Sequence, residues 1–483
     1  MATSDKTSGA EDRIAANPFR AVPAVGAVIE RLAATEAGAP AAPELLAFLT
    51  RREIAAIKNE IAAALKAGQK SAPPDLDGVA ARVRERLAEW RADSGTCRVV
   101  NGTGIVLHSG LGRAVLPKAA VDALARLDGY CLLEVDKENG ERRKRDAFLE
   151  EIIVEITGAE AALVVNNNAA ATMLVLNTTS AGKEVIVSRS QSIEIGGSFR
   201  MPDVMLMSGC RLHDVGTTNR SYVSDYDEAI GEATGALLLV HTSNYRIFGF
   251  TEHVGIEAMV ELGARRGLPV IHDLGSGSLL PFDRMGFEEE HPVQTSVRAG
   301  ADLITFSGDK MIGGTQAGII VGKKSWVERC RKNALARALR VDKLTCVALE
   351  ASLRLYLEGR PLESVPTLAM MMKDAGELER AARSLADAIG HALGKALSVE
   401  VVAESSEMGA GSLPARKLPT FCVALRSASI YAGDFARRLR MRPIPVFTRV
   451  KDDRILIDSR TLLEGDAGRI VAALAEIAGH MRT

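Results

Sequence analysis

A lysine set among small residues is the first group in this sequence that could do chemistry. Lys310 lies in TFSGDKMIGGTQAG, directly after an apolar run. Burial of an ammonium group is costly, so a lysine in such surroundings reaches solvent, pairs with an acid, or loses its charge by forming an imine with a carbonyl compound. Ser307, three residues earlier, supplies a hydroxyl group for an anion such as a phosphate. These residues alone leave the three alternatives open.

Two upstream segments supply what pyridoxal 5′-phosphate needs besides a lysine for its aldehyde: a carboxylate for its ring nitrogen and donors for its phosphate. Asp273 ends an apolar run in VIHDLGSGSL, and Asn166, Asn167 and Asn168 lead into an Ala-rich segment in VVNNNAAAT. Free amides at a helix start bind anions. Taken alone, the Asn triplet fits a capped turn equally well, and Asp273 is more simply explained as a residue that caps the end of a strand. Together with Lys310, in this order, they predict a pyridoxal 5′-phosphate site.

Seven short apolar runs must position these residues. They alternate with helix-length segments, which is typical of repeated β–α units. The pattern predicts an α/β fold with a mostly parallel seven-stranded sheet and helices on both faces, and such sheets bind ligands at the carboxyl ends of their strands. The runs are residues 161–165, 184–187, 211–215, 236–240, 268–273, 303–306 and 317–321.

The segment before the sheet differs in composition and predicts a separate domain. Residues 1–98 are rich in Ala, Leu, Glu and Arg, and a helix is expected at about 41–67. This predicts a small helical domain. The simplest interpretation of its cations Arg51, Arg52 and Lys58 is that they lie on a solvated helix face.

The rest of the chain is expected to divide at about residue 335. Residues 99–335 form the predicted large domain that contains the sheet. Residues 336–483 begin with helices and then interleave two β-runs with two helices, which predicts a smaller α+β domain. The β-runs are residues 420–425 and 454–457, and the helices are residues 371–393 and 465–477.

Composition limits the class of protein. The 483 residues carry 60 Lys plus Arg and 61 Asp plus Glu, so the formal net charge is -1 and there is no overall basic excess. A bound polyanion must therefore be held by local patches of positive charge. The six cysteines stand singly, which argues against a disulfide framework or a zinc ribbon. His213, His241 and His272 are expected to be strand-end residues whose hydrogen bonds are satisfied, and we expect no metal.

No apolar run approaches the ~18 residues of a membrane span and no signal peptide is visible, which predicts a cytoplasmic protein without membrane partners.

Several longer motifs carry a resemblance to a known family. They are ALVVNNNAAA, EVIVSR, EIGGSFRMPDVM, VGTTNR, VHTSNY, DLGSGSL, TFSGDKMIGGTQAGIIVGKK and RALRVDKLT. With these motifs the sequence resembles the bacterial selenocysteine synthases, the L-seryl-tRNA(Sec) selenium transferases, densely over residues 99–357. The resemblance implies a fold-type I pyridoxal-phosphate enzyme, active sites formed between the subunits of a homo-oligomer that is a ring of dimers, and an N-terminal domain that engages tRNA.

The resemblance also implies roles for single residues. Lys310 matches the cofactor lysine, and Asp309 matches its neighbouring acid. Arg113 in HSGLGRAVL, with Arg337 and Arg340 in ARALR, matches the arginines that hold the selenium donor, selenophosphate. Three guanidinium groups suit a tetrahedral oxyanion, and the i, i+3 spacing puts Arg337 and Arg340 on one helix face. Without the resemblance, these two residues would indicate a solvated basic helix.

The implied reaction converts seryl-tRNA(Sec) to selenocysteinyl-tRNA(Sec) through a cofactor-bound aminoacrylyl intermediate. Lys310 is expected to move the Cα proton, and Asp273 is expected to keep the cofactor ring protonated. One alternative is a pyridoxal-phosphate lyase or ammonia-lyase that acts on a small amino acid or an amino sugar phosphate. The other is a tRNA-binding paralogue without turnover.

Two segments depart from the family pattern. The usual His-Thr-Asn-Leu-Gly-Arg reads HSGLGR here, so an Asn side chain is lost at Gly110. The usual Arg-Gly-Ser-Arg reads RRKR at residues 142–145, and Phe148 replaces a His. Both segments are expected near the active site, so they bear on which donor or acceptor is bound.

Overall fold

The chain divides into two compact units, Met1–Arg98 and Val99–Thr483. None of the helices that the structure describes is long and apolar enough to span a membrane. The structure is a computed structural model, and it describes residues 17–34, 41–69, 71–92, 96–196, 199–287 and 290–479.

The first unit is helical. Buried Ile57 and Ile61 of α3 share one core with Val79 and Val83 of α4, and buried Glu53 bonds two arginines of α4. The expected solvated face is present, because the three cations named above are exposed on α3. A tRNA-engaging role for this unit stays a prediction. Its described elements are η1 (Pro18–Ala21), α2 (Val25–Ala33), α3 (Pro43–Lys66) and α4 (Leu76–Ala92).

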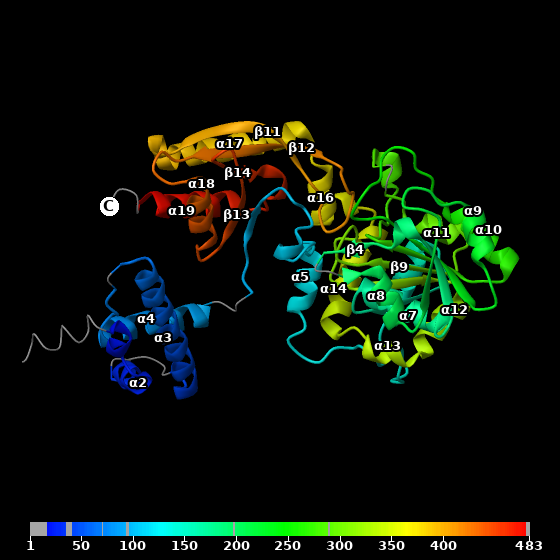
Figure 1. Ribbon diagram of the computed structural model, residues 1–483, viewed down its shortest axis with the longest axis horizontal. Coiled ribbons are helices and arrows are strands. Elements are labelled where there is room, and N and C mark those ends of the chain that lie inside the picture. The colour runs from blue at the N-terminus through cyan, green and yellow to red at the C-terminus, as the bar shows by residue number, and fades with distance from the viewer. Residues whose placement is uncertain are drawn as a thin grey trace, which may run out of the picture. The chain divides into compact units, whose positions relative to one another are not determined.

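The second unit contains a seven-stranded sheet, and each strand corresponds to one of the seven apolar runs (Figure 1). The order is β2-β10-β9-β8-β7-β3-β6, and only β10 runs antiparallel to its neighbours. The predicted α/β fold with a mostly parallel seven-stranded sheet is confirmed. The strands are β2 (Ala161–Val165), β3 (Glu184–Ser188), β6 (Arg211–Val215), β7 (Thr234–Val240), β8 (Val270–Gly275), β9 (Leu303–Ser307) and β10 (Gly318–Gly322).

Helices cover both faces of this sheet (Figure 1). Along β3, Ile186 packs into the core on one face, whereas Val185 and Val187 pack into the core on the other. Burial on both faces explains why the strands are continuous apolar runs. The first face carries α6 (Ala147–Thr157), α9 (Val223–Ala229), α10 (Ile256–Arg266), α11 (Val293–Ala299) and α14 (Lys343–Leu357), and the second carries α7 (Asn168–Ser180), α8 (Met201–Met207) and α12 (Lys324–Lys332).

A five-stranded sheet of order β1-β13-β14-β12-β11 forms the C-terminal part of this unit. Its edge strand β1 comes from residues that precede the large sheet and pairs in parallel with β13. The domain boundary expected at residue 335 stays a prediction. The elements are β1 (Val100–Gly102), β11 (Ser398–Ser406), β12 (Leu418–Arg426), β13 (Val446–Lys451) and β14 (Arg454–Asp458), with α17 (Ala375–Leu393), α18 (Ala432–Arg440) and α19 (Asp466–Gly479).

Candidate active site

A pocket of about 360 Å³ lies at the carboxyl ends of β7, β8 and β9. This is the edge of the sheet where the sequence predicts a ligand. The pocket brings together seven of the residues that we expected to form the site: Arg113, Asn167, Asn168, Asp273, Ser307, Asp309 and Lys310.

Asp273 is held by three hydrogen bonds. It lies on β8 and is only 3% exposed. One carboxylate oxygen accepts from Nδ2 of Asn168 at 2.8 Å and from the amide of Gly275 at 3.0 Å. The other oxygen accepts from the hydroxyl of Thr172 at 3.0 Å. These donors fix the carboxylate where it lines the pocket.

Lys310 follows β9 and is 7% exposed. Burial lowers the pKa of its ammonium group, although the nearby carboxylates of Asp309 and Asp273 oppose this effect. A lysine with a lowered pKa supplies the neutral amine that attacks a carbonyl group or accepts a proton.

Two members of the Asn triplet at the start of α7 have roles in the site. Asn167 caps the helix, because its side-chain oxygen accepts from the amide of Ala170 at 2.9 Å. Asn168 turns its amide group toward Asp273. Asn166 is exposed and is not among the residues that line the pocket. The first amides of α7 therefore border the pocket, with two of the three asparagine side chains beside them.

Close approach of the neighbouring strand helps to form this edge of the pocket. A Cβ atom at Gly318, the first residue of β10, would lie 2.0 Å from the carbonyl oxygen of Asn167. Only glycine fits there, so β10 pairs with β2 right up to the start of α7.

The arginines expected to hold an anion do not all meet in one chain. Arg113 pairs with Asp309 at 2.6 Å, and its backbone adopts the left-handed conformation with φ of 63°. Arg337 and Arg340 are exposed and do not line the pocket. Arg340 instead lies 3.3 Å from Glu134. A single copy thus contributes one arginine to the pocket that contains Lys310.

Thr172 is a residue of the site that reasoning from the sequence missed. It is fully buried and belongs to the segment VVNNNAAAT. The signal was its spacing, because Asn168 and Thr172 are four residues apart and so share one helix face. Both side chains donate to Asp273.

Comparison with known proteins identifies the family. The family model for L-seryl-tRNA selenium transferase (SelA) matches residues 99–463 of this chain. The chain belongs to this family. Its relatives include the L-seryl-tRNA(Sec) selenium transferase of Nitratidesulfovibrio vulgaris (strain Hildenborough), which is 45% identical over 95% of this chain and 99% of that protein. The enzyme of the same name from Alkaliphilus metalliredigens is 48% identical over 79% of this chain and 82% of that protein.

A solved structure supports the fold. D-Glucosaminate-6-phosphate ammonia-lyase has a TM-score of 0.55 over 80% of this chain and 97% of its own. Its sequence identity of 21% shows the shared fold alone. The resemblance and the fold class that the motifs predicted are both confirmed. Family and fold together imply a pyridoxal-phosphate enzyme.

Proposed function

We propose that this protein converts seryl-tRNA(Sec) to selenocysteinyl-tRNA(Sec), with pyridoxal 5′-phosphate as cofactor and selenophosphate as selenium donor. The observation that carries the proposal is the meeting of Lys310, Asp273 and the start of α7 in one pocket. The names of the relatives support it, because those enzymes are called L-seryl-tRNA(Sec) selenium transferases. Aminoacyl-tRNA is made in the cytoplasm, where we expect the enzyme to act.

The residues of the pocket fit the cofactor. The amine of Lys310 suits its aldehyde, Asp273 suits its ring nitrogen, and Ser307 with the first amides of α7 suits its phosphate. The side-chain oxygen of Asn168 is buried and has no hydrogen-bond partner among the described residues, as expected of a group that accepts a hydrogen bond from a bound ligand. When bound, pyridoxal phosphate withdraws electrons from the substrate's Cα atom and so acidifies its proton.

Each residue then has a task that follows from its surroundings. The buried amine of Lys310, with its lowered pKa, accepts the Cα proton of the seryl group. Asp273 is kept in one orientation by its three donors and so holds the ring nitrogen. Arg113 offers its guanidinium group to the anionic donor, and Asp309 orients that group by accepting a hydrogen bond from it at 2.6 Å.

Arg337 and Arg340 lie outside this pocket, so we propose that they reach the donor in the pocket of a second copy. The expected single helix face is wrong, because α13 (Ala334–Ala338) ends before Arg340, which instead bridges Val165 of β2. The two arginines nevertheless come from one short segment. Arg340 would exchange its contact with Glu134 for the donor. We also propose that the helical unit before residue 99 binds the body of the tRNA.

The test is product formation by the purified holoenzyme with seryl-tRNA(Sec) and selenophosphate. We expect selenocysteinyl-tRNA(Sec) from the wild-type protein and none from the Lys310→Ala variant. Lys323→Ala is the matched control, because Lys323 is exposed and pairs with Asp302 away from the pocket. Absence of product, or equal product from both lysine variants, contradicts the proposal.

A further inference from the structure

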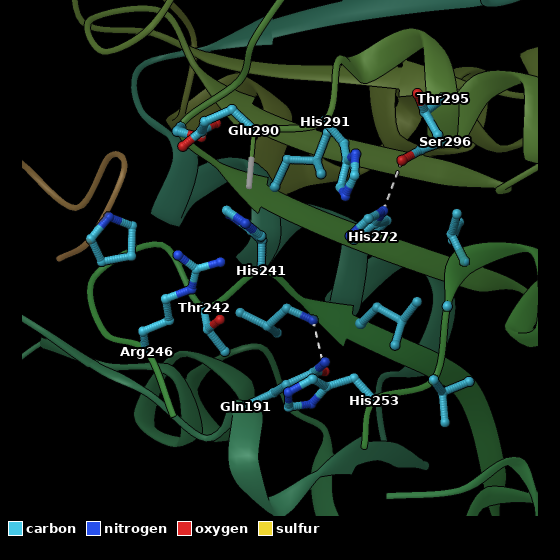
Figure 2. A pocket seen from close by; sticks show the side chains of 18 of the residues that line it. Gln191, His241, Thr242, Arg246, His253, His272, Glu290, His291, Thr295 and Ser296 are labelled. Atoms are coloured by element: carbon cyan, nitrogen blue, oxygen red, sulfur yellow. Dashed lines mark hydrogen bonds between the residues drawn. The ribbon is translucent and has the colours of Figure 1, made fainter. Parts of the chain in front are cut away.

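A second pocket, of about 590 Å³, adjoins the pocket that contains Lys310, and both are lined by Val240 and His241. It is lined by residues at the ends of β7 and β8, among them His241 and His272 (Figure 2). His272 and Asp273 are consecutive in β8, so their side chains point to opposite faces. Asp273 contacts α7, whereas His272 contacts Ser296 of α11.

Four of the eight histidines in the sequence line this second pocket: His241, His253, His272 and His291. Nδ1 of His272 lies 2.8 Å from the hydroxyl of Ser296. Burial, and then the neighbouring imidazoles of His241 and His291, lower the pKa of His272 to about 3. At neutral pH its ring is therefore uncharged, and Nε2, the nitrogen that does not bond Ser296, is left to donate or to accept according to the tautomer. In the part of the chain that the structure describes, no cluster of His, Cys, Asp or Glu is arranged to hold a metal ion.

One polar atom of the pocket is unsatisfied. Nδ1 of His241 is buried and has no hydrogen-bond partner among the described residues. Figure 2 shows the His241 side chain beside His272 in this pocket. Buried polar atoms in native proteins nearly always have a partner, so a ligand with a complementary group is expected here.

The second pocket also has a buried carboxylate in its lining. Glu290 is 1% exposed, and it accepts from the hydroxyl of Ser276 at 2.9 Å and from the amide of Leu413 at 3.2 Å. Its charge also acts on Lys310, whose ammonium form it favours. A carboxylate has about four lone-pair sites, so Glu290 can accept a further hydrogen bond from a ligand hydroxyl.

We propose that this second pocket binds the 3′-terminal adenosine of the aminoacyl-tRNA while its seryl group lies in the pocket with Lys310. The inference rests on the proposed function and names where its substrate is held. The seryl ester is attached directly to the terminal ribose, so that nucleoside must lie immediately beside the cofactor pocket. The shared residues Val240 and His241 meet this requirement.

The chemistry of the lining suits an unpaired RNA base. Such bases are bound by stacking on aromatic side chains and by hydrogen bonds to their edges. Tyr245 offers a ring, and the uncharged His272 with Thr295 offers donors and acceptors. Arg246, exposed beside the pocket, suits the adjoining phosphate. The volume falls within the ~300–1,000 Å³ typical of small-molecule sites.

The test compares two stable probes on the holoenzyme by calorimetry. One is the seryl amide of 3′-amino-3′-deoxyadenosine, and the other is serinamide, which lacks the nucleoside. We expect the nucleoside probe to bind at least about ten-fold more tightly. The double variant His291→Ala, Thr295→Ala should lose most of that advantage, because it removes two polar side chains that line the pocket. His391→Ala is the matched control, since His391 is an exposed histidine on α17.

The outcomes separate this inference from the proposed function. Equal binding of the two probes by the wild-type enzyme overturns the inference, as does a nucleoside advantage that the double variant retains. The cofactor's absorbance reports on the function instead, because either probe should change it through the serine amine. If the double variant does not fold, the cytidine counterpart of the probe replaces it: the wild-type enzyme should prefer adenosine, and no preference overturns the inference.

Discussion

Substitution of Thr172 by valine tests how the cofactor's carboxylate is held. Valine has nearly the shape of threonine but lacks the hydroxyl group that donates to Asp273. Thr172 is fully buried, so no water can replace the lost donor. Thr172→Ser is the matched control, because serine keeps the hydroxyl group and loses only a methyl group.

The size of the effect follows from the geometry. A hydrogen bond to a charged group contributes about 1.5–3 kcal/mol to stability. The hydroxyl of Thr172 also lies 3.0 Å from the carbonyl oxygen of Asn168, so its single proton is shared between two acceptors. We therefore take the lower end, about 1.5 kcal/mol, which corresponds to about a ten-fold loss in cofactor affinity.

The assay is equilibrium binding of pyridoxal phosphate, followed by its absorbance on the protein. Thr172→Val should bind about ten-fold more weakly than the wild type, whereas Thr172→Ser should stay within about three-fold. The reasoning is refuted if the two variants bind the cofactor equally well. That result would mean that Asn168 and Gly275 hold Asp273 without help from α7's second turn.

Four further predictions concern the cofactor lysine, the helical N-terminal unit, the anion-binding arginines and the burial of the Lys310 charge. Borohydride reduction and peptide mapping should find the pyridoxyl group on Lys310, and a label on another lysine would contradict the cofactor assignment. Deletion of residues 1–95 should abolish tRNA binding and spare the cofactor's absorbance; full tRNA affinity in the truncated protein would exclude the proposed role. Arg337→Ala or Arg340→Ala should leave cofactor-dependent loss of the seryl hydroxyl intact and weaken use of selenophosphate about ten-fold in single-turnover assays. Equal damage to both steps would instead assign these arginines to the acceptor. Burial lowers the pKa of Lys310, so the unfolded apoprotein binds more protons below the ordinary lysine pKa. The free energy of unfolding should therefore rise with pH in that window, and Lys310→Met should flatten this rise. If the variant leaves the slope of unfolding free energy against pH unchanged, Lys310 is not the group that causes the rise.

The large sheet could be predicted because its strands are buried on both faces and so appear as continuous apolar runs. The direction of β10 could not be inferred from its composition, which matches that of the parallel strands. Its connection carried the signal instead. Residues 308–317 are fewer than the dozen or so that a parallel crossover needs, so the chain turns back on itself. Strand β1 was missed because three residues, one of them glycine, carry no readable alternation.

The candidate site could be predicted as far as strand ends determine it. Asp273 lies near the end of β8 and Lys310 follows the neighbouring strand β9, so the fold itself brings them together. The histidines show where sequence reasoning fails. His213 lies near Glu184 and His272 near Ser296, as expected of satisfied strand-end residues, yet Nδ1 of His241 has no partner among the described residues. Convergence of histidines from strand β8 and from separate loops is a property of the fold and leaves no regular spacing in the sequence.

The departures from the family pattern have local partners in the structure. The guanidinium group of Arg143 stacks 3.6 Å from the ring centre of Phe148, the residue that replaces a histidine. Arg145 pairs with Glu134 at 2.7 Å, the same carboxylate that lies near Arg340. None of these residues lines the pocket that contains Lys310. The changes therefore alter the surroundings of Arg340, which we propose reaches the donor in the pocket of a second copy. They leave the lysine, the aspartate and the helix start that we propose bind the cofactor unchanged.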